Sequence, residues 1–137
     1  MDAGIADAVD VADVVLEDGR TIELRSSTKH DGDPLGHWEL SVEASGYGGT
    51  LLGAAWVAGM DGVDQAPVTL FVVRGRAGEH VGPCVLARAA ELAAQRGVNH
   101  LIAEIPSGEE RAAQATVAAL RHHPLPAGVS IDTSADT

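Results

Sequence analysis

A loop at residues 74–80 carries the groups in this sequence with the clearest potential for chemistry. It follows an apolar segment ending at Val73 and precedes a helical pattern beginning at Val81. The loop holds two arginines and two glycines: Arg74, Arg76, Gly75 and Gly78. Backbone amides at the start of a helix favour an anion, and guanidinium groups match phosphate oxygens. The loop is therefore a candidate anion site. The alternative is that the glycines only serve the turn and the arginines only offset nearby acids.

Other residues capable of chemistry have less informative spacing. Four possible metal ligands share one polar segment: His30, Asp31, Asp33 and His37. Their spacing matches no known ligand pattern, so we predict a solvated loop and no metal site. Cys84 lies one turn into the predicted helix with no partner base in view, which favours a buried small residue. His122 and His123 are adjacent and point in different directions, so we expect them only to complement the end of a helix.

Turn residues and hydrophobic periodicity predict the elements that position these groups. Val14–Leu24 is predicted to be a hairpin with a two-residue Asp18-Gly19 turn, because Asp-Gly tolerates the positive φ that such a turn requires. Residues 26–37 are rich in turn formers and are predicted to be a loop. Further strands are predicted at 38–45 (half-buried), 50–58 (covered on both faces), 67–73, 99–105 and 129–132.

Two helices are predicted after these first strands. One begins at Val81 and stops at Gly97, and the other begins at a capping box formed by Ser107 and Glu110 and ends before Pro124. The predicted fold class is α+β, a mixed and mainly antiparallel sheet with a β-α-β-α crossover and helices packed on it. We expect an acidic arm at 1–12, a single domain at 13–132 and a tail at 133–137.

Composition limits the partners and the compartment. The chain has 137 residues, with 20 acidic and nine basic side chains and a net charge of -11. Such a surface repels phosphate backbones and anionic lipid, so we expect neither nucleic acid nor membrane as a partner. A single cysteine excludes an intrachain disulfide, and no secretory signal or long apolar run is seen. These features predict a soluble protein of the cytoplasm.

The order and spacing of these segments resemble the GNAT (N-acetyltransferase) superfamily. Residues 18–25 are similar to its first strand, and residues 70–120 to the half of that fold that binds acyl-CoA. Within that half, residues 80–86, 94–98 and 101–105 resemble its succession of pyrophosphate loop, helix, glycine stop and next strand. The resemblance covers about 100 residues and depends more on element order than on identity.

The resemblance implies a GNAT-like fold that binds acetyl-CoA or another acyl-CoA and transfers the acyl group to an amine by direct attack. Residues 70–73 would pair with the pantetheine arm, and the loop amides would hold the pyrophosphate. The implied cofactor-binding residues are Phe71, Val72, Val73, Arg74, Arg76, Gly78, His80, Val81 and Gly82. Glu104 is the candidate general base, with an outward, solvated carboxylate as the alternative.

Departures from the family pattern favour a second hypothesis. His80 replaces a loop glycine and Glu79 precedes it, Pro67 falls where a glutamate base is often found, and Tyr47 is the only tyrosine. The two helices that usually wall the acceptor pocket are missing between Arg25 and Trp38. The alternative is a catalytically inactive module acting in protein interaction or regulation, with a partner protein or a second copy covering its exposed apolar surface.

Overall fold

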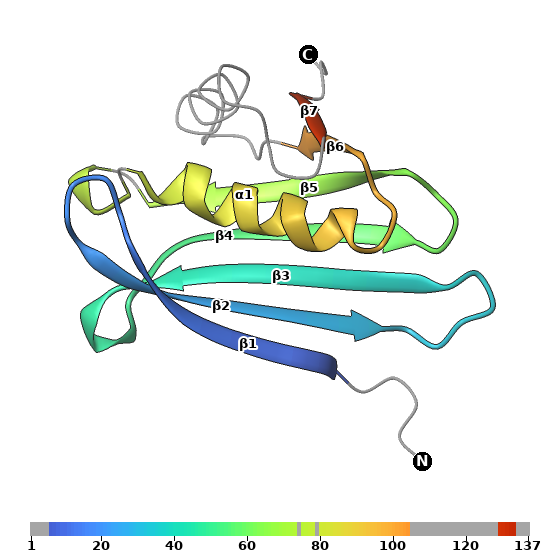
Figure 1. The fold of residues 1–137 in the computed structure, drawn as a ribbon, viewed down its shortest axis with the longest axis horizontal. Coiled ribbons are helices and arrows are strands. Elements are labelled where there is room, and N and C mark those ends of the chain that lie inside the picture. Colours follow the sequence, from blue (N-terminus) through green and yellow to red (C-terminus); the bar gives the residue numbers. More distant parts are fainter. Residues whose placement is uncertain (1–5, 74, 79, 105–128, 134–137) are drawn as a thin grey trace.

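The computed structural model describes residues 6–73, 75–78, 80–104 and 129–133, which form a sheet with a helix on one face (Figure 1). The strands are β1 (Ala6–Val15), β2 (Thr21–His30), β3 (His37–Ser45), β4 (Leu51–Met60), β5 (Gln65–Val72), β6 (His100–Glu104) and β7 (Ser130–Thr133). The helix is α1 (Val81–Ala94), and two short 3-10 turns, η1 (Tyr47–Gly49) and η2 (Arg76–Gly78), lie in the loops.

The seven strands lie side by side in chain order. Neighbouring strands from β1 to β5 are antiparallel, whereas β5–β6 and β6–β7 are parallel. The helix α1 connects β5 to β6 and packs against β3, β4 and β5. β1 stands at one edge of the sheet and β7 at the other (Figure 1).

The core lies between α1 and the sheet, and strand alternation fills it. In β3 the side chains facing α1 are buried, whereas the intervening ones face away. The buried set is Trp38, Leu40, Val42 and Ala44. The inner face of α1 supplies Val85 and Leu86 together with alanines. These small residues let the helix lie close to the sheet, as expected of a chain with few aromatic side chains.

The β1–β2 hairpin turn is longer than the sequence predicts. Leu16 and Arg20 form the closing pair, with the Leu16 amide donating to the Arg20 carbonyl at 2.8 Å. Three residues, Glu17 to Gly19, therefore make the turn instead of two. Gly19 has a φ of 90°, the left-handed conformation that closes a three-residue hairpin loop.

The predicted fold class, a GNAT-like α+β fold with a β-α-β-α crossover and helices packed on the sheet, is wrong. The described residues form mostly a seven-stranded mixed sheet, and α1 is their single α-helix. The second predicted helix, at 107–123, lies outside the described residues. None of the described helices is both long and apolar enough to cross a membrane.

Two local predictions are corrected by strand pairing. Residues 6–12, expected in an acidic arm, belong to β1, which pairs with β2 as far as Ala6. Residues 26–30, expected in a loop, continue β2, since each of them pairs with a residue of β3. Polar composition alone suggested a loop at 26–30, but paired backbone groups make a strand there.

Candidate functional site

The predicted anion site lies at the corner where β5 passes through η2 into α1. Gly78 is buried here, and a Cβ on it would stand 2.0 Å from the Val73 carbonyl oxygen. On the neighbouring strand, a Cβ on Gly53 would stand 2.7 Å from Val81 Cγ1. The corner is therefore packed tightly around its backbone. Val81 is fully buried, whereas Arg76 is exposed.

The structure brings most of the predicted cofactor residues to this corner. Phe71 and Val72 end β5, Val73 follows them, and Arg76 and Gly78 bound η2. His80, Val81 and Gly82 begin α1. Arg74 and Glu79 lie outside the described residues. Glu104 is the last residue of β6 and pairs in backbone register with Thr69, away from the helix start.

The first turn of α1 has few amides to offer a ligand. His80, the residue before the helix, is left-handed with a φ of 67°, and its side chain makes no capping hydrogen bond. Val81 and Gly82 are buried, and Pro83 has no amide hydrogen. Helix geometry alone therefore makes this a poorer anion site than the sequence suggests.

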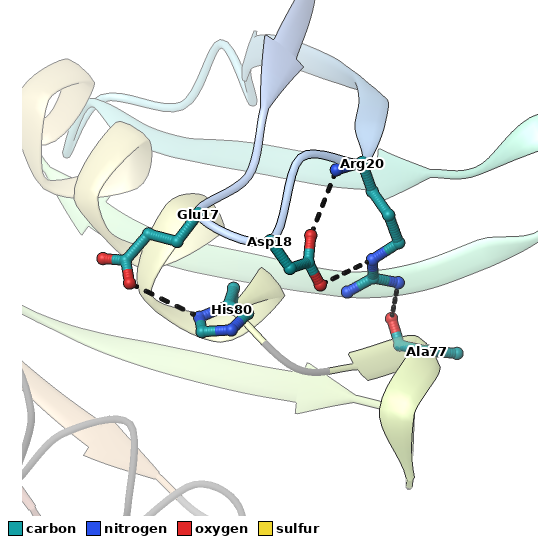
Figure 2. Close-up of polar contacts among 5 residues, drawn as sticks. All are labelled: Glu17, Asp18, Arg20, Ala77 and His80. Carbon is teal, nitrogen blue, oxygen red and sulfur yellow. Dashed lines mark hydrogen bonds and ion pairs between the residues drawn. The ribbon is translucent and has the colours of Figure 1, made fainter.

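The turn of the β1–β2 hairpin lies against the same corner (Figure 2). Arg20 Nη1 donates to the Ala77 carbonyl oxygen at 3.0 Å, while Arg20 Nε donates to Asp18 Oδ2 at 2.9 Å. Glu17 Oε2 is 3.8 Å from His80 Nδ1. Two carboxylates thus stand beside the backbone that was expected to hold a pyrophosphate.

These contacts define the electrostatics of the corner. Hydrogen bonds from the Arg20 amide and guanidinium lower the pKa of Asp18, so this carboxyl group is ionised at neutral pH. The Arg20 guanidinium already interacts with Asp18 and with the Ala77 carbonyl. A diphosphate here would meet the Glu17 carboxylate and a guanidinium already engaged by Asp18, so the corner attracts it less than the arginines of the loop suggest.

The remaining sequence candidates show little sign of activation. Asp33 accepts hydrogen bonds from the His37 amide and ring, and the amide is the main cause of its lowered pKa. Among the residues that the structure describes, no three His, Cys, Asp or Glu side chains gather as metal ligands. Burial raises the pKa of the Cys84 thiol, the opposite of what a nucleophile needs.

A groove that the sequence did not reveal lies on the sheet face opposite α1. Its volume is about 380 Å³. Trp56 of β4 lines it and is 39% exposed. The backbone partners of Trp56 are Ser41 on β3 and Thr69 on β5, and both also line the groove. The indole therefore stands in a row of hydroxyl-bearing residues at the centre of the sheet.

The groove combines small polar residues with a charged rim. Ser27 Oγ and Ser41 Oγ share a hydrogen bond of 2.9 Å, which orders one side of the row. Lys29 lies directly opposite Glu39, an arrangement that suits an ion pair and partly neutralises this end. A second groove of about 260 Å³ continues the hollow and shares Glu39, Ala58 and Pro67 with the first.

Sequence reasoning missed Trp56 because residues 50–58 read as a strand covered on both faces. In the structure Trp56 and Ala58 are exposed, while Ala55 and Val57 are buried. The uniformly apolar run hides this alternation. One signal was available: the polar outer residues of 38–45 already marked one face of the sheet as uncovered, and a neighbouring strand shares that face.

In comparisons with known proteins, no family model, curated protein or solved structure matches the chain.

Proposed function

We propose that this chain is a non-catalytic protein-interaction module that binds a segment of a partner protein in the groove beside Trp56. The observation that carries the proposal is an indole 39% exposed on a central strand, at the wall of a groove on the face away from the helix. A large aromatic side chain next to a hollow is a common energetic centre of protein interfaces.

The composition of the groove supports a polypeptide ligand. Trp56 and Pro67 offer apolar surface, and the hydroxyl groups of Ser41 and Thr69 offer hydrogen bonds at close spacing. Lys29 and Glu39 give the rim charges of both signs, which favours a ligand without a strong net charge. An extended segment with one bulky apolar side chain fits this pattern.

Selection from a random linear peptide library, followed by affinity measurement on the purified chain, tests the proposal. We expect binders whose affinity falls about 30-fold on Trp56→Ala, since removing such a centre costs about 2 kcal/mol. Trp56→Phe should retain part of the affinity, because a smaller aromatic ring replaces the indole.

Leu51→Ala is the matched control for this experiment. Leu51 is an exposed apolar residue of the same strand, 37% exposed, and lies outside both grooves. Its loss should leave the affinity unchanged. Binders that tolerate Trp56→Ala as well as they tolerate Leu51→Ala, or a failure to select any binder, would reject the proposal.

Binding of an acyl-CoA at the corner between β5 and α1 is a second candidate. It is favoured by the exposed Arg76 beside a helix start whose preceding side chain gives no cap. Calorimetry with acetyl-CoA tests it, and Arg76→Glu should abolish any heat of binding. Glu17→Gln should strengthen binding, since it removes a carboxylate near His80. Acyl transfer to an amine, with Glu104 as base, stays a prediction of the resemblance.

We also propose the cytoplasm as the location of this module. A single cysteine supports a reducing compartment, because no intrachain disulfide is possible. Location of a tagged full-length chain by cell fractionation tests this point.

A further inference from the structure

The outer edge of β1 is a long strand edge with no neighbour in the part of the chain that the structure describes. β1 runs for ten residues, and its only partner strand there is β2. A strand edge of this length presents a row of backbone donors and acceptors to another chain. Natural edges are usually protected by proline, charged side chains, a β-bulge or a covering segment. β1 contains neither proline nor lysine; it has three aspartates and a register shift between Ala6 and Ala8, beyond which its pairing with β2 runs without interruption to Val15.

The side chains of β1 on the open face of the sheet alternate in character. Val11 is 47% exposed and Val15 is 68% exposed, and Asp13 between them is also exposed. Asp13 stands directly opposite Glu23 of β2. Like charges placed opposite each other across two strands repel, so this pair is destabilising until a cation approaches it.

A hollow beside this pair has room for a long side chain. Its volume is about 610 Å³. Three carboxylates and one guanidinium line it: Asp13, Glu23, Glu43 and Arg25. Arg25 stands opposite Glu43, and one guanidinium offsets only one of the three carboxylates, so the hollow keeps a net negative charge. The apolar–acidic–apolar pattern of β1 is thus complementary to an apolar–basic–apolar strand.

The other face of β1 lies on the side of α1 and the core, where Asp10 and Ala12 are still exposed. Asp10 Oδ2 accepts a hydrogen bond from Arg88 Nη2 of α1 at 2.9 Å, and Ala12 and Val14 stand opposite the buried residues Leu24 and Ile22. An incoming strand would therefore be recognised by the backbone edge and by the open face.

Antiparallel pairing of two copies centred on Asp10 or on Asp13 would place that aspartate opposite its own copy, so these registers are disfavoured. A basic segment does not meet this repulsion.

We propose that β1 accepts an extended basic segment of a partner protein as an added strand, with a lysine or arginine beside Asp13 and apolar residues beside Val11 and Val15. This surface is separate from the groove beside Trp56, and the proposal does not depend on that groove.

A blocked peptide with the core sequence Val-Thr-Lys-Thr-Val tests the proposal, because it reads the same in both strand directions. Fluorescence anisotropy with the intact chain should show saturable binding. N-methylation of one set of alternate residues should weaken the affinity at least tenfold, while N-methylation of the other set should be tolerated, since only one edge of the peptide faces β1. Replacing the peptide lysine by glutamate should weaken binding by a similar factor.

Protein variants distinguish strand pairing from general attraction to an acidic surface. Asp13→Asn should weaken binding several-fold without loss of folding, because it also relieves the repulsion with Glu23. Asp64→Asn removes the same charge from an exposed loop remote from β1 and should have no effect. Any one of four results would overturn the proposal. These are equal affinities for both N-methylated peptides, equal effects of Asp13→Asn and Asp64→Asn, no binding of the peptide, or self-association of the chain through β1.

Discussion

Replacing Gly59 by alanine should be among the most damaging single-methyl changes in this protein. Gly59 of β4 pairs with Trp38 of β3, and a Cβ on Gly59 would stand 2.2 Å from Trp38 Cζ2 and 2.5 Å from Cε2. Ordinary carbon–carbon contacts are about 3.5–4.0 Å, so the indole must move by more than about 1 Å. Trp38 is only 1% exposed, so any movement of the indole disturbs the core side chains around it.

The expected cost of Gly59→Ala is at the upper end of the usual range for overpacking, about 3 kcal/mol. For a domain of this size that corresponds to a fall in Tm of about 10 °C. Gly59 does not have a positive φ, so the cost comes from the methyl group and not from backbone strain. Urea unfolding followed by circular dichroism measures the change in free energy of unfolding.

A double-mutant cycle with Trp38→Leu tests the reasoning behind this number. Without the indole, the methyl group of Gly59→Ala has room, and its cost should fall below about 1 kcal/mol. The two changes together should therefore cost about 2 kcal/mol less than the sum of the single changes. Costs that simply add would refute the claim that Gly59 is required by the indole.

Three further predictions follow from the contacts of individual side chains. Hydrogen bonds from His37 hold the pKa of Asp33 below its ordinary value of 3.8. Asp33→Asn should therefore lower Tm above that pH, and the difference in Tm between the variant and the original chain should vanish as the pH falls through the lowered pKa. A Tm difference that grows as the solution becomes more acidic would contradict this. Burial raises the pKa of Cys84, so a thiol reagent should modify it about tenfold more slowly in the folded chain than in urea, and equal rates would disprove the burial. Arg88 of α1 forms an ion pair with Asp10 of β1. Arg88→Ala should lower the free energy of unfolding by only about 0.5 kcal/mol but should speed amide hydrogen exchange in β1. Unchanged exchange in β1 would show that this ion pair does not hold the strand.

The spacing of hydrophobic residues and the positions of turn-forming residues predicted individual strands and helices well where both signals were present. Strict alternation placed a half-buried strand at 38–45, and β3 occupies His37–Ser45 with that alternation of burial. Three- and four-residue spacing placed a helix from Val81, and Gly97, with a φ of 91°, lies just beyond it. These signals are local, so they survive without knowledge of the rest of the fold.

Features that depend on distant partners were not predictable in this way. β2 continues through the polar residues 26–30 because β3 supplies its hydrogen-bonding partners. The predicted fold class is wrong because strand pairing draws residues 6–12 and 26–30, whose composition indicates an arm and a loop, into the sheet. The contact of Arg20 with Ala77 joins residues 57 positions apart, and no pattern in the sequence indicates it. That contact places carboxylates at the predicted anion site.

Collisional quenching of the two tryptophans tests the central claim, that the sheet face beside Trp56 is open to a ligand, most directly. In Trp38→Phe the only indole is Trp56, and acrylamide should quench its red-shifted emission efficiently. In Trp56→Phe the only indole is the buried Trp38, whose blue-shifted emission should resist quenching. If Trp56 is shielded as fully as Trp38 in the purified chain, that face is covered, and the proposed interaction site does not exist.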